Sequence, residues 1–213
     1  MAKVQVLASL LLAIFCLQSL QVFGSDPELT SDFKVPDGEN ATALDGNFFT
    51  FPGFRNFTAN PSDAPLVTTM RADLSNFAAL DGLGISSTLV VAPPGTVNPP
   101  HVHPRASELV FVLEGTVDIG FVDTTNTLRT QTLKEGDLFI VPRGLVHFQF
   151  NNYQTTAKFL NSFSSASPGV ARLPTTLFGT GIADAVLIKS FGVTADVIDK
   201  LQEAEGAGTQ PGY

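Results

Sequence analysis

The chain has 213 residues, of which 44% are hydrophobic and 15% are charged, and its formal net charge at pH 7 is −8. This acidic balance, with no cluster of lysine or arginine, argues against nucleic acid as a partner. The sequence contains a single cysteine, Cys16. Because one cysteine cannot form an internal disulfide, the fold must be held together by packing and hydrogen bonds.

Residues 1–24 have the pattern of a secretory signal peptide. Their only charge is Lys3, which precedes an apolar run from Val4 to Phe15, and modest or small residues lead to a cleavage point after Gly24. The alternative is a membrane anchor, but polar residues interrupt the run and no basic cluster follows it. We therefore expect a secreted protein without a membrane span, whose mature chain, residues 25–213, lacks cysteine and forms one domain.

The first part of the mature chain, residues 25–60, carries glycosylation sequons and many aromatic residues. Sequons begin at Asn40 and Asn56, while proline disqualifies a third at Asn60. We expect a glycan at one or both sites in a secreted protein. The phenylalanines are expected to clamp this segment onto the rest of the fold, and they are Phe33, Phe49, Phe51, Phe54 and Phe57.

The middle of the chain consists of short β-rich runs separated by glycine and proline. These runs predict strands at residues 86–92, 108–113, 116–123, 128–133, 137–141, 146–151 and 156–162. Their rhythm is typical of an all-β sandwich or barrel. The end of the chain has helical spacing instead, which predicts helices at residues 182–190 and 193–204, with Thr194 as the cap of the second.

All three histidines of the chain fall in two short motifs. In the first motif, His101 and His103 share a face only if the segment is extended, because side chains alternate along a strand. Glu108 has the wrong parity for one straight strand. The chain must therefore turn before Glu108, and Pro104 with Ser107 supplies that turn.

The second motif adds one more imidazole. His147 lies on a strand that follows a turn at residues 142–144, and Gln149 and Asn151 share its face. Imidazole nitrogen and carboxylate oxygen are ligands that intermediate divalent metals accept. A lone His-x-His pair is often two half-exposed strand histidines, but four donors in two turn-bounded motifs favour a metal site. The predicted site consists of His101, His103, Glu108 and His147.

Both motifs resemble the two sequence boxes of the cupin superfamily, and specifically those of plant germins and germin-like proteins. Residues 98–105, Asn-Pro-Pro-His-Val-His-Pro-Arg, and residues 142–148, Pro-Arg-Gly-Leu-Val-His-Phe, carry the similarity. It implies a cupin jelly-roll β-barrel with C-terminal α-helices, in which the four predicted residues bind manganese. The ligand chemistry alone does not select this metal, because the same donors hold zinc or copper more tightly.

The resemblance also implies an oligomeric assembly, and the chain departs from the family in one feature. Germins are hexamers, built as trimers of dimers. Residues that could form such contacts, unless they pack inside one subunit, are Leu109, Phe111, Leu113, Ile188, Val193, Val197, Ile198 and Leu201. Most germin-like proteins have a cysteine pair near the mature N-terminus, where this chain has Lys34 and Gly53. The missing bridge removes about 2–4 kcal/mol of stabilisation.

The metal alone does not name the substrate, because four protein ligands leave two positions of a six-coordinate ion open. The first hypothesis, which the family resemblance implies, is a manganese oxidoreductase of the plant cell wall or apoplast that dismutates superoxide or oxidises a small acid such as oxalate. Asn98 and Gln149 would hydrogen-bond the small oxygen ligand. Oxalate itself is nevertheless not the expected substrate. By the resemblance, Thr88 replaces an asparagine of oxalate-oxidising germins, and Leu89 and Val91 replace their arginine and aspartate.

Two other hypotheses remain open. The protein could be a non-enzymatic wall or surface protein, receptor-like and active in defence or development, with a structural metal. It could also perform a different metal-cupin chemistry, such as isomerisation or hydrolysis, on an organic ligand in a pocket reshaped around Thr88 and Leu89. A His103→Ala variant separates redox catalysis from a scaffold, because only catalysis demands the metal.

Overall fold

The computed structural model describes residues 26–55, 57 and 66–207. In this part of the chain the strands are β1 Thr68–Ala72, β2 Ser86–Ala92, β3 Val97–Val102, β4 Glu108–Glu114, β5 Thr116–Val122, β6 Leu128–Lys134, β7 Leu138–Val141, β8 Val146–Phe150, β9 Ala157–Phe163 and β10 Ala171–Arg172. The helices are α2 Leu173–Phe178, α3 Asp184–Phe191 and α4 Ala195–Ala207, with short 3-10 turns η1 Ala41–Ala43 and η2 Ala78–Leu80.

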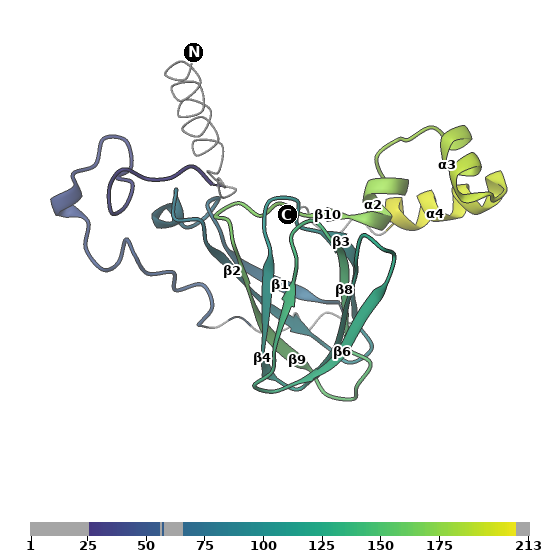
Figure 1. The fold of residues 1–213 in the computed structure, drawn as a ribbon, viewed down its shortest axis with the longest axis horizontal. Helices are drawn as coiled ribbons and strands as arrows, with labels where there is room; N and C mark the ends of the chain where they lie inside the picture. Colours follow the sequence, from purple (N-terminus) through teal and green to yellow (C-terminus); the bar gives the residue numbers. More distant parts are fainter. Residues whose placement is uncertain (1–25, 56, 58–65, 208–213) are drawn as a thin grey trace, which may run out of the picture.

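The strands form two five-stranded antiparallel sheets, in the orders β1-β2-β9-β4-β7 and β10-β3-β8-β5-β6. Figure 1 shows the two sheets wrapped into one barrel. Alternation along β4 explains why they face each other: Val110 and Val112 are fully buried, whereas Leu109 and Phe111 point outward and are exposed. The predicted all-β jelly roll with C-terminal helices is confirmed.

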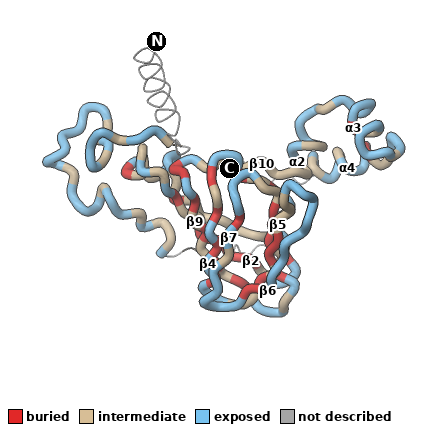
Figure 2. Tube along the Cα trace, in the orientation of Figure 1, coloured by how far each residue is buried: buried red, intermediate tan, exposed pale blue. Residues whose placement is uncertain are grey.

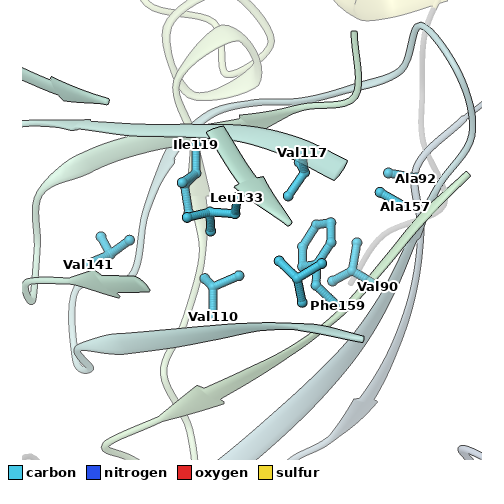
Figure 3. Packing of buried hydrophobic residues seen from close by; sticks show 10 residues of the cluster. Val90, Ala92, Val110, Val117, Ile119, Leu133, Val141, Ala157 and Phe159 are labelled. Atoms are coloured by element: carbon cyan, nitrogen blue, oxygen red, sulfur yellow. The ribbon is translucent and has the colours of Figure 1, made fainter. Parts of the chain in front are cut away.

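The barrel interior is apolar toward one end of its strands and polar toward the other. Toward one end it holds a close-packed apolar core, shown in Figure 3, to which Val110, Val117, Ile119 and Phe159 contribute. At the other end of β4 the inward residue is Glu108, which is also buried. Buried positions colour the barrel strands red in Figure 2, while the segments outside the barrel are mostly exposed. The apolar end therefore stabilises a scaffold whose opposite end can carry polar side chains.

The seven predicted strands match β2 and β4–β9 to within one residue at each end. The sequence patterns do not predict β1, β10 or α2. Strand β1 is half-buried along most of its length and lacks apolar alternation, while β10 has only two residues and α2 has six. Such short or weakly patterned elements form because neighbouring strands and helices are already in place.

The N-terminal arm, residues 26–55, is held by aromatic and ionic contacts. Phe33 packs edge to face on Phe49 with ring centroids 5.1 Å apart, and Phe51 contacts both Phe54 and Phe77. At the position of the missing cysteine, Lys34 forms an ion pair of 2.6 Å with Asp81. Of these aromatic contacts, only the one between Phe51 and Phe77 joins the arm to the rest of the fold, so the predicted clamp is confirmed for Phe51 alone.

The structure describes one of the two predicted glycosylation sites, Asn40. Asn40 is exposed, and its Oδ1 accepts a hydrogen bond from the Thr42 backbone N–H at the start of η1. Asn56 and residues 1–24 lie outside the described residues, so glycosylation and the signal peptide stay predictions.

The C-terminal helices extend away from the barrel, on the side opposite the N-terminal arm (Figure 1). Helices α3 and α4 each begin two residues later than predicted. The Thr194 carbonyl accepts hydrogen bonds from Val197 and Ile198 at the start of α4, while its hydroxyl donates to the Asp196 side chain. No helix in the described part of the chain is long and apolar enough to span a bilayer.

For one helix residue the structure selects the alternative, which is packing inside the subunit. Ile198, expected among the possible subunit contacts, is fully buried within the single chain and is not available to a partner. Leu201 on the same helix is 39% exposed, and Val186 and Phe191 of α3 are 55% and 50% exposed. Periodicity places residues on an apolar stripe, but it does not say which part of that stripe the other helices of the same chain cover.

Candidate metal centre

Four side chains from three neighbouring segments converge at the polar end of the barrel. His101 is in β3, His103 follows that strand, Glu108 opens β4 and His147 is in β8. Strand pairing places His101 directly opposite His147, and a turn at Pro104 brings the chain round to Glu108. One potential ligand atom from each residue lies within 4.8 Å of the others. The structure therefore brings together all four residues that the sequence singled out.

Backbone carbonyls fix the tautomer of each imidazole. The Nδ1 atoms of His101, His103 and His147 lie 2.8, 2.5 and 2.9 Å from the carbonyl oxygens of Pro99, Gly169 and Leu145. A carbonyl oxygen can only accept, so each Nδ1 carries the proton and donates. Each Nε2 then presents a lone pair, which is the state that a metal ligand needs.

The ligand atoms lie close together without partners, an arrangement that is unfavourable without a cation. Glu108 Oε2 lies 2.7 Å from His147 Nε2 and 3.5 Å from His103 Nε2. Both Glu108 oxygens and His147 Nε2 are buried without a hydrogen-bond partner. Buried acceptors that face one another repel, and they are expensive to leave unpaired. A divalent cation between them would satisfy every one, so this donor set fits a metal ion.

Burial also favours the neutral form of His101 and His103. Desolvation holds the pKa of His101 well below its usual 6.5, and the neighbouring His147 and His103 lower it further. Desolvation lowers the pKa of His103 as well, although Glu108 opposes this effect. Neutral imidazole is the metal-binding form, so the site is prepared for a cation at mildly acidic pH.

Two buried amides stand beside the four donors. Asn98 Nδ2 donates to Gln149 Oε1 at 2.7 Å, and the two residues are register partners on β3 and β8. This bond leaves Gln149 Nε2 buried without a partner. Asn151, on the same face, is structural instead, since its Nδ2 donates to the carbonyls of Ala92 and Thr155.

A cavity of about 450 Å³ opens on the His101 and His103 side of the four donors. Thr88 lines it, as does Asn98. The expectation that Leu89 shapes this pocket is wrong. Leu89 is not among the lining residues, because Ser86, Thr88 and Val90 take the inward positions of β2 and leave Leu89 on the other face of the sheet.

Sequence reasoning missed several residues of the cavity wall, which include Arg71, Arg105 and Asn161. Strand parity could have found Asn161, because it alternates with the buried residues Phe159 and Phe163 on β9. Arg71 lies outside the recognised motifs, and Arg105 closes the first histidine motif but gives no sequence signal for this cavity. Arg105 reaches it through a long-range contact, in which its Nε donates to the Ser167 carbonyl at 2.6 Å.

The segment that follows β9, residues 164–170, connects the cavity to the metal centre. Gly169 has φ +67°, and its carbonyl oxygen accepts the hydrogen bond from His103 Nδ1. The Arg105 guanidinium packs over it so closely that a Cβ at Gly169 would lie 2.8 Å from Nη2. Gly169 is thus required both for the backbone turn and for the close approach of Arg105.

We expect Gly169→Ala to destabilise the protein and to loosen metal binding. The substitution adds backbone strain of about 1–2 kcal/mol at positive φ and pushes Arg105 away, so the carbonyl that orients His103 shifts. Thermal unfolding and metal content after dialysis measure the two effects. Gly136→Ala is the matched control, since Gly136 has φ +89° and a Cβ at that position would have no neighbouring atom within 4 Å. Equal metal retention in both variants would refute the orienting role.

The chain is similar to known proteins in both sequence and structure. The Cupin family model matches residues 46–199. Germin-like protein 9-3 of Oryza sativa subsp. japonica is 42% identical over 201 residues, which are 92% of this chain and 94% of that protein. An oxalate oxidase solved with the substrate analogue glycolate is 31% identical and has a TM-score of 0.80, covering 86% of this chain and 100% of that chain.

A more distant structural likeness is to the oxalate decarboxylase of Bacillus subtilis, described for its Mn(II) centres. It is 22% identical with a TM-score of 0.59, and the match covers 66% of this chain and 36% of that chain. At this identity the likeness establishes a shared fold only.

Proposed function

Because the chain belongs to the germin-like proteins of the cupin family, we propose that it is a secreted manganese glycoprotein of the plant cell wall or apoplast that dismutates superoxide. The observation that carries the proposal is the convergence of His101, His103, Glu108 and His147, with ligand atoms buried and unpartnered. Bound manganese would supply reversible one-electron redox chemistry. The family resemblance favours manganese over the metals that these ligands would hold more tightly.

The residues around the four ligands suit a small oxygen species. The three imidazoles are held in the ligating tautomer by backbone carbonyls, and Glu108 contributes the negative charge. Gln149 Nε2 is a buried donor without a partner, so it can donate to an oxygen ligand beside the metal, while Asn98 holds the Gln149 amide in position. A fixed donor of this kind costs no reorganisation when charge develops on the ligand.

Oxalate oxidation is not part of the proposal, although a solved relative is an oxalate oxidase. Thr88 lines the cavity, at the position where the family resemblance places an asparagine in oxalate-oxidising germins. A threonine hydroxyl is shorter than an amide and cannot make the same contact, so an oxalate-shaped site would be left partly unsatisfied.

The experiment that tests the proposal is metal analysis of protein secreted from a eukaryotic host, with superoxide dismutase and oxalate oxidase assays on the same sample. We expect near-stoichiometric manganese, dismutase activity that is lost in His103→Ala, and no oxalate oxidase activity. Manganese without either activity would favour a non-enzymatic wall protein. Absence of manganese from the purified protein would overturn the assignment of the site.

The lowered pKa values predict how metal retention depends on pH. A free imidazole with pKa of about 6.5 becomes protonated below that pH. Because burial lowers the pKa of His101 and His103, both stay neutral below it, and metal loss is displaced to lower pH. We expect the metal to be retained below pH 6.5 and released on further acidification.

The lowered pKa values of His101 and His103 also determine how the stability of the metal-free protein changes with pH. Below about pH 6.5 the imidazoles of His101 and His103 bind protons in the unfolded chain but not in the folded protein. The free energy of unfolding therefore falls as the pH falls. The contribution of these imidazoles to that free energy is fully present above that pH. Metal content and thermal unfolding measured across pH 4–8 check both statements. Metal release centred at or above pH 6.5 would contradict them.

A second candidate function is favoured by one observation, the size of the cavity. A volume of about 450 Å³ falls in the range of small-molecule sites, which is about 300–1,000 Å³, and it exceeds what superoxide needs. The same metal centre could therefore act on an organic acid. This candidate predicts that a small carboxylate competes for the open metal positions.

We also propose that the protein is a hexamer, built as a trimer of dimers. Two apolar regions of the single chain support an assembly of copies. One is the outer face of β4 and β7, and the other is formed by the projecting helices, on which Val186, Phe191 and Leu201 are exposed. Helices that extend from a barrel cannot cover their apolar stripes alone.

A further inference from the structure

Asp26, at the start of the N-terminal arm, binds the 164–170 segment in the wall of the cavity. Its Oδ1 accepts a hydrogen bond of 2.5 Å from the Ser165 hydroxyl, and its Oδ2 accepts one of 2.6 Å from the Ala166 backbone N–H. Distances this short are typical of hydrogen bonds to a charged carboxylate, which are roughly twice as strong as neutral ones. One carboxylate therefore joins positions that are 139 and 140 residues apart in the chain.

Lys34 attaches the same arm to a different part of the fold. Its ammonium group pairs with Asp81 at 2.6 Å, at the end of η2 and between β1 and β2. This ion pair does not involve the 164–170 segment. The two polar attachments of the arm can therefore be removed one at a time.

Loss of the Asp26 carboxylate would leave a buried donor without its partner. Ser165 and Ala166 are 0% and 2% exposed, so the Ala166 N–H has no direct access to solvent. An unpartnered N–H in such a position is costly, and native structures rarely contain one. Without the carboxylate, the 164–170 segment must move or admit water.

The 164–170 segment is irregular, so its shape depends on contacts with other parts of the chain. Each carbonyl oxygen from Ser165 to Gly169 accepts a hydrogen bond from outside the segment. In the order of the acceptors, the donors are Ser86 Oγ, the Leu74 N–H, Arg105 Nε, the Arg105 N–H and His103 Nδ1. Between Ala166 and Gly169 the donors belong to Arg105, whose long side chain is exposed and can move with the segment. A shift at Ala166 is therefore passed on to Gly169.

The far end of the segment orients a residue of the candidate metal centre. The Gly169 carbonyl accepts the hydrogen bond from His103 Nδ1 at 2.5 Å. The partner of the second ring nitrogen fixes the direction of a metal-binding imidazole, and its loss typically lowers metal affinity by about 10–100-fold. Asp26 stands one step behind this partner, so a smaller effect of the same kind is expected from its removal.

We propose that Asp26 is a positioning residue of the metal centre. By fixing the 164–170 segment it fixes the Gly169 carbonyl, and with it the direction of the His103 imidazole. This inference rests on the proposed metal site. It also gives the N-terminus of the mature chain a role in the site, because the predicted cleavage after Gly24 makes Asp26 the second residue that remains.

The test is the rate at which the manganese-loaded mature protein loses its metal to an excess of chelator. Asp26→Ala removes both acceptor oxygens and should accelerate the loss about three- to tenfold. The electron paramagnetic resonance spectrum of manganese(II) should change as well, because the His103 ring is no longer held in one direction. Asp26→Asn keeps one acceptor oxygen but loses the charge, so its rate should lie between those of wild type and Asp26→Ala.

Lys34→Ala is the matched control, since it removes the other polar attachment of the arm. It should leave both the rate and the spectrum unchanged. Equal acceleration in Lys34→Ala and Asp26→Ala would overturn the proposal, because metal loss would then follow the loosening of the whole arm. An unchanged rate in Asp26→Ala would also overturn it. If Asp26→Ala does not fold, Asp26→Asn decides, and a wild-type rate in that variant would refute the positioning role.

A measurement on the metal-free protein separates this inference from the proposed function. Hydrogen exchange of residues 164–170, followed by mass spectrometry, should be faster in Asp26→Ala but not in Lys34→Ala. Unchanged exchange in Asp26→Ala overturns the positioning role even where manganese is bound. If wild type carries no manganese, while exchange and the rate of zinc loss both depend on Asp26, the proposed redox function falls and the positioning role stands.

Discussion

Glu108→Gln is expected to abolish metal binding while leaving a folded protein. The glutamine amide keeps the shape of the glutamate but removes its charge and one ligand oxygen. Metal affinity should fall by about a hundredfold or more, since even residues that only orient a ligand are worth about 10–100-fold. The metal-free variant should nevertheless be more stable than the metal-free wild type.

The reason for that stability lies in the crowding of the acceptors. Glu108 Oε2 and His147 Nε2 are 2.7 Å apart and make no hydrogen bond with each other. A glutamine N–H can donate to His147 Nε2, so the variant replaces a buried charge with a satisfied pair. Each 1 kcal/mol gained raises the unfolding temperature by roughly 2–4 °C in a domain of this size.

Glu114→Gln is the control for Glu108→Gln, because Glu114 lies on the same strand and is exposed. Metal content by mass spectrometry and thermal unfolding with and without a chelator measure both effects. Retention of stoichiometric metal in Glu108→Gln would mean that the carboxylate is not a ligand. A large loss of stability in the metal-free variant would mean that Glu108 is a structural partner of His147 instead.

The four residues of the candidate metal centre could be located from the sequence because they lie in two local motifs. Parity along a strand places His101 and His103 on one face, and a proline turn corrects the parity of Glu108. The same parity defines the outward face of β4, where Leu109, Phe111 and Leu113 are 38%, 39% and 40% exposed. Each of these predictions depends on residues within about ten positions of one another.

The rest of the site depends on long-range pairing that no local pattern reveals. The placement of Asn161 opposite Thr88 requires the register of β2 on β9. The orientation of His103 depends on a carbonyl 66 residues away. The family resemblance predicts Leu89 as a pocket residue. Because neighbouring residues of a strand point to opposite faces, Leu89 and Thr88 cannot both face the pocket, and the structure places only Thr88 there. Ile198 is buried because the three C-terminal helices pack on one another within the chain.

The outer face of β4 and β7 is the strongest candidate for a contact between copies of this chain. Its outward side chains are Leu109, Phe111, Leu113, Leu138 and Ile140. The register aligns Leu109 with Ile140 and Phe111 with Leu138, so the apolar side chains form one continuous surface. Strand β7 is also an edge strand of its sheet. An apolar surface at a sheet edge is an aggregation hazard unless a specific partner covers it.

We therefore expect Phe111→Lys to break the assembly. Phe111 is 39% exposed in the single chain, so the lysine is solvated in an isolated subunit but would be desolvated without a partner inside an interface, which is unfavourable by several kcal/mol. Light scattering coupled to size exclusion should show a hexamer for wild type and smaller species for the variant. Leu128→Lys is the control, since Leu128 is 55% exposed on β6, at the edge of the other sheet. If Phe111→Lys remained hexameric with unchanged thermal stability, the face of β4 and β7 would not be an interface, and the exposed helix residues Val186, Phe191 and Leu201 would be left to hold the copies together.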